Sequence, residues 1–454
     1  MDVAERIRLR KHLCADGLIR TLRACFEKIS DPRKDPDIPL ADALMSACAM
    51  FSLKCRSLLA FDKQRRAGNI RRLFGVGKVP CDSQMREILD PVDLEELRPA
   101  FSDIFRQVQR GGALRRFQFL GRYYLVSLDG TQYFQSEKVH CDGCLVKTSK
   151  NGTVTYCHQM VGAVIVHPDR RAVLPLCPEP IVKQDGQTKN DCERNATKRL
   201  LPKIRSDHPH LRMIVIEDGL ASNAPHIREL KDHRFHYILG AKPGDHTDLF
   251  GQVDRHKGTP RATAVHRKDP KTGRLEVCWM VPDVPLNKSN PDVRVNFFDY
   301  AEIDTTCGKT VKYFSWVTDL EVTAENVWEM ARGGRARWKI ENETFNTLKN
   351  QDYHYEHNFG HGKQNLSVVF AYLMMLAFLV DQVQQLCCPL FAAAYKKLGC
   401  KRDLWQQLRG KFDNFVLESM RQLFEAIVYG LARTPPPIAY PSGIASLPSY
   451  DDSS

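Results

Sequence analysis

Apolar strand-like segments alternate with amphipathic helical segments through the middle of the chain, and this alternation limits the folds it can adopt. The strand-like runs are "YYLVSLDGTQYF" (123–134), "HQMVGAVIVH", "LRMIVIEDG" and "FHYILGAK". The helix-like runs "DCERNATKRLLPKIR" and "APHIRELKDH" separate the later strands. Such alternation is typical of an α/β layer fold, in which helices cover a sheet. We therefore predict an α/β core.

The pattern changes on both sides of this core, as expected for a chain of 454 residues. Apolar residues recur at helical spacing near the N-terminus, and a polar stretch with short strand-like pieces interrupts the core after residue 243. The end of the chain is rich in Pro and Ser and is predicted to be disordered. The predicted regions are a helical N-terminal region for DNA binding or dimerisation (1–120), a first core segment (121–243), a β-rich insertion (244–311), a second core segment (312–385) and a helical C-terminal region with a disordered tail (386–454).

The charge balance favours a polyanionic partner. Lys and Arg number 66 against 54 Asp and Glu, which gives a formal net charge of +12. Nucleic acid is the commonest partner of a protein with such a surplus. An enzyme that is basic for another reason is the alternative, and composition does not separate the two.

Nothing in the first residues or in the apolar runs predicts export or membrane insertion. "MDVAERIRLRKHLC" is charged throughout, so we expect the 15 Cys residues to be reduced in a cytoplasmic setting. The longest apolar run, "LSVVFAYLMMLAFLV" (366–380), is shorter than the ~20 residues that a membrane span needs. We predict a buried helix there and no membrane partner.

Two Asp-Gly pairs follow apolar strand segments. Asp129 is placed at the end of "YYLVSLDG", and Asp218 at the end of "RMIVIEDG". In open α/β sheets, ligand sites gather at the C-terminal ends of the strands. A strand-terminal Asp followed by Gly also begins a turn, so each pair has a purely structural interpretation. Two such ends in one sheet favour a site.

A third carboxylate lies in "RARWKIENETFNTLKNQ" (335–351), a helix-like run that combines acidic and basic residues. Glu341 is the candidate, and Glu343 is its rival. Three converging carboxylates repel one another unless a cation neutralises them. Oxygen ligands suit Mg²⁺ or Mn²⁺, and two such ions ~4 Å apart can assist displacement at a phosphodiester. A solvated amphipathic helix with i,i+4 ion pairs is the structural alternative.

From about residue 30 to about residue 385, the chain resembles the DDE transposases of bacterial insertion sequences. The resemblance depends on "SLDGTQYF", "IEDGLASNAPHI" and "ARWKIENETFNTLKNQDYHYEHNFGHG". It is closest to the subgroup that carries a β-rich insertion between the second Asp and the Glu. The resemblance implies an RNase H-like core with Asp129, Asp218 and Glu341 as ligands of catalytic Mg²⁺ or Mn²⁺.

The same resemblance implies cut-and-paste transposition by metal-dependent DNA cleavage and strand transfer. The expected partners are double-stranded DNA, as terminal inverted repeats and target, and a second copy of the chain in a synaptic complex. The expected location is the bacterial cytoplasm, in association with the nucleoid. Related enzymes that form DNA hairpins hold a flipped base on an aromatic of the insertion, for which Trp279 is the candidate. A Trp in the core of a β module is the other interpretation.

The subgroup carries a Tyr-Arg-Glu-Lys signature around its catalytic Glu, and this chain departs from it twice. Arg337 and Glu341 are four residues apart, so an α-helix places them on one face, with Arg337 directed at phosphate. Gly334 stands in the Tyr register and Leu348 in the Lys register. Lys349 follows one residue later, roughly 80° further around an α-helix. We therefore expect Lys349 to matter less than the lysine of the family.

Further polar and basic residues lie near these motifs. Asn223, His226 and His361 could contact phosphate, or could cap helices and form turns. The stretch "KQRRAGNIRRLFG" (63–75) could bind terminal-repeat DNA or could be a solvated face. Its candidate DNA contacts are Arg65, Arg66, Arg71 and Arg72.

The segment "VHCDGCLVKTSKNGTVTYCHQM" suggests a second metal. Cys141 and Cys144 form a C-x-x-C pair, and Cys157 and His158 follow an Asn-Gly turn that would fold the segment into a hairpin. Four such ligands match a structural Zn²⁺ site, with His140 as a substitute for Cys157. Reduced thiols on a hairpin are the alternative.

Two other functions remain open at this point. The chain could be an RNase H-like DNA nuclease without strand transfer, which would use the same carboxylates. It could also be a transposase-derived DNA-binding protein without activity, although all three acidic residues are present. The joining of cleaved ends to a target separates the first alternative from a transposase.

Overall fold

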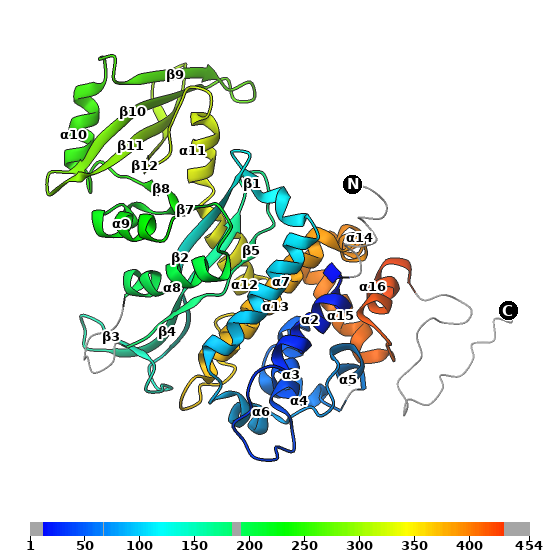
Figure 1. The fold of residues 1–454 in the computed structure, drawn as a ribbon. Helices are drawn as coiled ribbons and strands as arrows, with labels where there is room; N and C mark the ends of the chain where they lie inside the picture. Colours follow the sequence, from blue (N-terminus) through cyan, green and yellow to red (C-terminus); the bar gives the residue numbers. More distant parts are fainter. Residues whose placement is uncertain (1–11, 67, 184–191, 431–454) are drawn as a thin grey trace, which may run out of the picture. The chain divides into compact units, whose positions relative to one another are not determined.

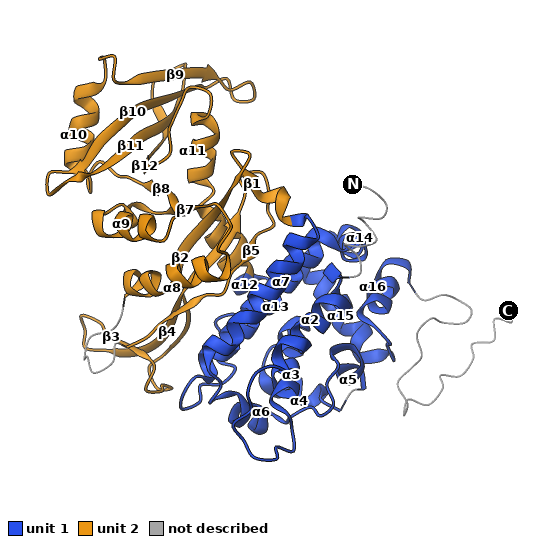
Figure 2. Cartoon of the chain, in the orientation of Figure 1, with its two compact units in different colours: residues 1–113, 348–454 blue, residues 114–347 orange. Residues whose placement is uncertain are grey.

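The computed structural model describes residues 12–66, 68–183 and 192–430, and the predicted disordered tail lies outside these ranges. Two compact units make up the chain (Figure 2). Unit 2 is a single segment, Leu114–Thr347. Unit 1 combines the two ends of the chain, Met1–Ala113 and Leu348–Ser454. Unit 1 therefore requires two segments that are far apart in sequence to fold on one another.

The described part of unit 1 is helical. Its helices are α2 (Ala15–Phe26), α3 (Leu40–Ser52), α4 (Leu58–Gln64), α5 (Gly68–Phe74), α6 (Asp82–Leu89), α7 (Leu94–Arg110), α13 (Leu366–Cys387), α14 (Pro389–Leu398), α15 (Lys401–Asn414) and α16 (Met420–Tyr429). The N-terminus of α7 is capped by Asp93, whose side chain accepts a hydrogen bond from Glu95 N at 3.0 Å. The helical character predicted for both ends of the chain is confirmed for the described residues.

Helix α13 is the core of unit 1, and the predicted buried helix is confirmed. It is the one helix of the described residues that is long and apolar enough to span a membrane, yet 94% of its most apolar window is buried. It packs on α3 and α7 of the other chain segment. Its single acidic residue, Asp381, is buried and binds Lys54 Nζ at 2.6 Å. A core position in unit 1 thus explains the hydrophobicity of α13.

Unit 2 is built on a sheet in which twelve described strands take part. The main order is β3-β4-β2-β7-β8-β12-β11-β10-β9 (Figure 1). These strands are β2 (Tyr123–Ser136), β3 (Leu145–Thr148), β4 (Val154–Val166), β7 (Met213–Glu217), β8 (His236–Gly240), β9 (Thr263–Lys268), β10 (Leu275–Asn287), β11 (Asn290–Ile303) and β12 (Thr310–Thr318). The short strands β1 (Gln118–Phe119), β5 (Leu174–Pro175) and β6 (Glu179–Ile181) add to β2 and β4.

The sheet is mixed and mostly antiparallel. Only the pairs β2–β7 and β7–β8 are parallel among the described strands. The helices α8 (Glu193–Asp207) and α9 (Ala224–Asp232) provide the crossovers that parallel pairing requires. Both helices and their neighbouring strands match the predicted alternation. The fold is therefore mixed α/β, with the parallel layer confined to three central strands.

The region predicted as a β-rich insertion extends the same sheet. It begins with helix α10 (Thr247–His256) and continues through β9, β10 and β11. Strand β12 returns and pairs with both β11 and β8, with Trp316 opposite Gly240. Figure 1 shows these strands continuing the layer beyond β8. The β content of this region is confirmed.

Candidate functional site

The parallel register of β2 and β7 brings Asp129 and Asp218 to neighbouring positions. The last paired residues are Ser127 and Ile216. Asp129 lies two residues after Ser127, and Asp218 lies two residues after Ile216. Both carboxylates thus lie just beyond the parallel pairing of β2 with β7, and Asp218 follows the end of its strand as predicted.

The prediction that β2 ends at Asp129 is wrong. The strand continues to Ser136, and Asp129 pairs with Gly162 of β4. Gly130 therefore forms no turn. A Cβ atom at Gly130 would lie 2.5 Å from a carboxyl oxygen of Glu193, and Gly130 N donates to Glu193 Oε1 at 3.1 Å. Glycine is present because this glutamate approaches the strand closely.

Asp218 does begin a turn, and it lines the site as well. Its side chain caps the short 3-10 helix η2 (Gly219–Ala221) by accepting from Leu220 N at 2.9 Å. Gly240 of β8 leaves room for this turn, because a Cβ there would lie 3.1 Å from Gly219 N. The two interpretations of this Asp-Gly pair are compatible.

The helix that carries Glu341 is not the straight α-helix expected. Helix α11 (Val327–Arg335) ends before Arg337, and a π-helix, η3 (Ile340–Phe345), follows and leads into α12 (Asn346–Asn350). The expected α-helical stacking of Arg337 on Glu341 is therefore wrong, because Arg337 lies in the intervening turn. Phe345 anchors the π turn on the sheet, where a Cβ at Gly162 would lie 2.8 Å from its ring.

Arg337 contacts the first aspartate directly. Its Nη1 lies 3.4 Å from Asp129 Oδ2, and its carbonyl accepts from Ser127 Oγ at 3.0 Å. Gly334, where the resemblance leads one to expect a tyrosine, is explained by Trp316, because a Cβ at Gly334 would lie 2.5 Å from the indole. The aromatic ring beside this turn thus comes from β12.

Electrostatics link the acidic residues of this edge. The pKa of Asp129 is raised, first by burial and further by the charges of Asp218 and Glu341, although Arg337 opposes the rise. The pKa of Glu193 is raised by desolvation first and then by Asp129, Glu217 and Asp218. The charges of neighbouring carboxylates therefore act on Asp129 and Glu193, a condition that favours a cation.

Asp129, Glu193, Glu217 and Asp218 border one cavity of ≈430 Å³ within unit 2. Its lining residues are Leu128, Asp129, Cys192, Glu193, Arg194, Thr197, Glu217, Asp218, Leu220, Ala221, Asn223 and His226. Glu193 and Glu217 were missed by the sequence reasoning. Glu217 stands directly before Asp218 in "IEDG", a signal that was available, whereas Glu193 comes close only through tertiary packing.

Asn223 and His226 have structural partners in this cavity. The Asn223 side chain caps α9 by accepting from His226 N at 3.1 Å. His226 Nε2 lies 2.6 Å from Glu217 Oε2. Burial of the imidazole lowers its pKa, but the charge and hydrogen bond of Glu217 outweigh this effect, so the pKa of His226 is raised. The capping role considered for Asn223 is confirmed.

The carboxylates do not form a single-ion cage in this structure. In the described part of the chain, the one group of metal-ligating residues with all ligand atoms within 4.8 Å includes Cys141, Cys144 and His158, and no acidic residue. Asp129, Asp218 and Glu341 are brought to one edge but are spaced more widely than the ligands of one ion.

The cysteine pair and His158 do meet. Cys141 Sγ and Cys144 Sγ are 3.9 Å apart, and His158 Nε2 lies 3.4 Å and 3.5 Å from them. Strands β3 and β4 form the predicted hairpin, and Cys144 and His158 are buried in it. The group could hold a metal ion such as zinc.

Cys157 and His140 are not part of this group. Cys157 precedes His158 on β4, and successive residues of a strand point to opposite faces of the sheet. The prediction of Cys157 as a ligand, or of His140 in its place, is therefore wrong. His140 is exposed and stacks on Tyr156, with the two ring centroids 4.3 Å apart.

The remaining candidate DNA contacts are dispersed. Trp279 is half-buried on β10, with Lys257 Nζ 5.9 Å from its ring centroid. His361 belongs to unit 1 and is buried. Arg65 pairs with Asp62 at 2.9 Å, and Arg66, Arg71 and Arg72 are exposed. Lys349 Nζ pairs with Glu356 at 2.9 Å. Their DNA-binding roles stay predictions.

No protein-family model matches the chain, and no curated protein matches it.

Proposed function

We propose that this protein is a DDE-type transposase with an RNase H-like catalytic core, which cleaves DNA and transfers the cut strand in the bacterial cytoplasm. The observation that carries the proposal is the meeting of Asp129 and Asp218 on adjacent parallel strands, beside the turn that bears Glu341. The order of these residues along the chain and the surplus of positive charge support it.

The three predicted carboxylates fit divalent cations as a donor set. Asp129, Asp218 and Glu341 offer only oxygen ligands, which suit Mg²⁺ or Mn²⁺, and their mutual repulsion decreases when a cation binds. Such ions, when bound, lower the pKa of an attacking water or hydroxyl and neutralise charge on the phosphate.

The protein's own residues supply binding and orientation. Arg337 holds Asp129 by one long contact and keeps 17% of its side chain exposed, so its guanidinium can also reach a phosphate oxygen. The π turn changes the register of Lys349. A π turn adds one residue relative to an α turn, so Lys349, eight residues after Glu341, takes the angular position of the seventh. The seventh position is where the family carries its lysine.

Purified protein, Mg²⁺ and a plasmid that carries the DNA flanking the gene test this function. We expect cleavage at the element ends and joining to a second plasmid. Asp129→Asn, Asp218→Asn and Glu341→Gln should each abolish both steps while duplex binding persists. Glu343→Gln, on the same π turn, is the matched control and should remain active.

The products distinguish the alternatives. Cleavage without joining would favour a nuclease, and binding without cleavage would favour a DNA-binding protein that has lost activity. Full activity in any one of the three carboxylate variants would remove that residue from the site.

The Cys141, Cys144 and His158 group is proposed to bind zinc. Tetrahedral Zn²⁺ with Zn–S of about 2.3 Å and Zn–N of about 2.0 Å places two sulfurs about 3.8 Å apart and S and N about 3.5 Å apart. The distances of 3.9, 3.4 and 3.5 Å between the ligand atoms agree with this geometry. Zinc would join the loop before β3 to strand β4.

A further inference from the structure

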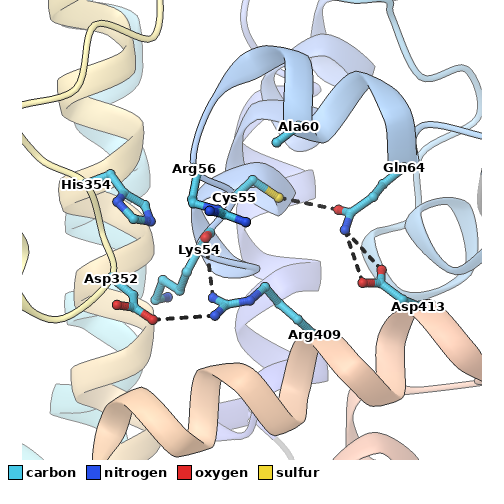
Figure 3. A pocket seen from close by; sticks show the side chains of 9 residues that line it. All are labelled: Lys54, Cys55, Arg56, Ala60, Gln64, Asp352, His354, Arg409 and Asp413. Atoms are coloured by element: carbon cyan, nitrogen blue, oxygen red, sulfur yellow. Dashed lines mark hydrogen bonds and ion pairs between the residues drawn. The ribbon is translucent and has the colours of Figure 1, made fainter.

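A second cavity, of ≈420 Å³, lies entirely within unit 1 and is lined by residues of both its chain segments (Figure 3). The first segment contributes the loop after α3 and part of α4. The second contributes the loop after α12 and the helix α15. The lining residues are Lys54, Cys55, Arg56, Ala60, Gln64, Asp352, His354, Arg409 and Asp413.

The backbone of this cavity is held in an unusual conformation. Lys54, Asp352 and His354 have φ values of 57°, 66° and 56°, and they are three of the seven described non-glycine residues with positive φ. Side chains other than glycine seldom adopt this left-handed region, and such residues gather at ligand-binding sites. The concentration of three of them in one cavity wall indicates a preformed site.

One buried carboxylate fixes both walls. Asp381 Oδ2 accepts from Lys54 Nζ and from Tyr353 Oη, each at 2.6 Å. Lys54 is fully buried, and Arg56 follows it by two residues at the mouth of the cavity. Tyr353 is buried between Asp352 and His354, which line the opposite wall. The cavity is therefore set in shape before any ligand arrives.

The acidic residues of the cavity are already engaged. Asp352 lies 3.4 Å from Arg409 Nη2 and 3.7 Å from Arg402 Nε. Asp413 accepts from Gln64 Nε2 at 3.1 Å, and burial raises its pKa. The negative charge that could repel an anion is thus partly compensated.

Two cationic or hydrogen-bonding groups at the mouth remain available. Among the described residues, no hydrogen bond or ion pair engages the guanidinium of Arg56 or the imidazole of His354, as Figure 3 also shows. A neighbouring hollow of ≈710 Å³ shares these two residues and adds Lys63 and His357. One guanidinium group can bind two oxygens of a phosphate at once. A positively charged groove can bind successive phosphates of a nucleic-acid backbone.

We propose that this cavity of unit 1 binds a backbone phosphate of DNA through Arg56 and His354, with the adjoining hollow accepting the continuing strand at Lys63 and His357. The proposal depends on the proposed function for the identity of the polyanion. It assigns DNA contacts to a site that both segments of unit 1 build, and it is separate from the cavity of Asp129 and Asp218 in unit 2.

Binding of the full-length protein to a fluorescent DNA duplex, measured in EDTA at several salt concentrations, tests the proposal without cleavage. Arg56→Ala should weaken binding at low salt about three- to tenfold and should lower the slope of log affinity against log salt by about one. Arg56→Lys should keep the slope. Arg20→Ala, at an exposed arginine of α2, is the control and should bind as the wild type does.

The outcomes of the binding and cleavage assays test the cavity proposal and the proposed function separately. An affinity and a salt slope that stay unchanged in both Arg56→Ala and His354→Ala would overturn the proposal. Failure of the cleavage assay with intact, Arg56-dependent DNA binding would overturn the proposed function alone. Normal cleavage with Arg56-independent binding would overturn the cavity alone.

Discussion

Gly130 and Gly162 illustrate how single residues determine the geometry of the candidate site. The first leaves space for the carboxylate of Glu193, and the second leaves space for the ring of Phe345. Neither has a positive φ, so their function is close approach and not a special backbone conformation. Both strands pass beside the acidic edge because these positions lack a side chain.

At the same scale, the zinc proposal separates two cysteines of one hairpin, Cys144 in the loop before β3 and Cys157 on β4. Cys144→Ala should reduce bound zinc from about one per chain to near zero, because the ion loses one of its two thiolate ligands. Cys157→Ala is the matched control, since its thiol lies outside the group, and it should keep the metal. Elemental analysis of protein purified without added zinc measures both. Equal loss of zinc in the two variants would contradict the group as described.

The pair of His226 and Glu217 should make stability depend on pH. The folded-state pKa of His226 is raised, so the stabilisation is fully present below its unfolded pKa of about 6.5 and is lost as pH rises through the folded value. We expect Tm to fall from pH 6 to pH 9 more in the wild type than in Glu217→Gln. Thermal unfolding at matched ionic strength measures the difference, and parallel pH profiles would remove the pair as the cause.

At the scale of elements, the π-helix η3 is the feature that changes a functional expectation. A straight α-helix turns Lys349 away from Glu341, whereas the added residue of the π turn returns Lys349 to the position expected of a phosphate contact. The hydrogen bond from Asn346 N to Glu341 O, five residues apart, is the local signature. π turns are frequent at functional sites.

Lys349→Ala should therefore lower DNA cleavage about as strongly as Arg337→Ala does. Single-turnover cleavage of pre-bound element ends compares the two variants. Lys257→Ala, near Trp279 in the β10 region, provides a control for general loss of positive charge. An effect of Lys349→Ala more than about tenfold weaker, or ~1.4 kcal/mol in the barrier, would support the straight-helix expectation instead.

At the scale of the whole molecule, unit 1 is assembled from the two ends of the chain, whereas unit 2 is one continuous segment. Lys54 and Asp381 join the two segments of unit 1 across 327 residues of sequence. The ammonium is completely buried and lies 4.2 Å and 4.3 Å from the ring centroids of Tyr353 and Trp405. Burial lowers the pKa of Lys54, although Asp381 opposes this effect.

Asp381→Asn should destabilise the protein by about 3–5 kcal/mol, because it leaves the buried ammonium without its counter-ion. The double variant Lys54→Met, Asp381→Leu should recover much of that loss. Glu425→Ala, which breaks an exposed pair with Arg421, is the control and should cost at most about 1 kcal/mol. Urea unfolding measures all three, and a double variant no more stable than Asp381→Asn would contradict this account.

The sequence alone determined the elements and the order of the acidic residues. Alternating apolar patterns located the strands β2, β7 and β8 and the helices α8 and α9, since burial on a sheet demands those periods. The apolar composition of α13 predicted its burial. The C-x-x-C spacing of Cys141 and Cys144 predicted a metal-binding group, because this spacing is typical of zinc ligands.

Only the tertiary structure decided which side chains meet. The continuation of β2 past Asp129, the approach of Glu193 and the exclusion of Cys157 depend on sheet register and on the opposite directions of neighbouring side chains. The π turn before Lys349 and the left-handed residues of the unit 1 cavity are strained local conformations. Local propensity does not favour such conformations, and only the packing around them keeps them in place.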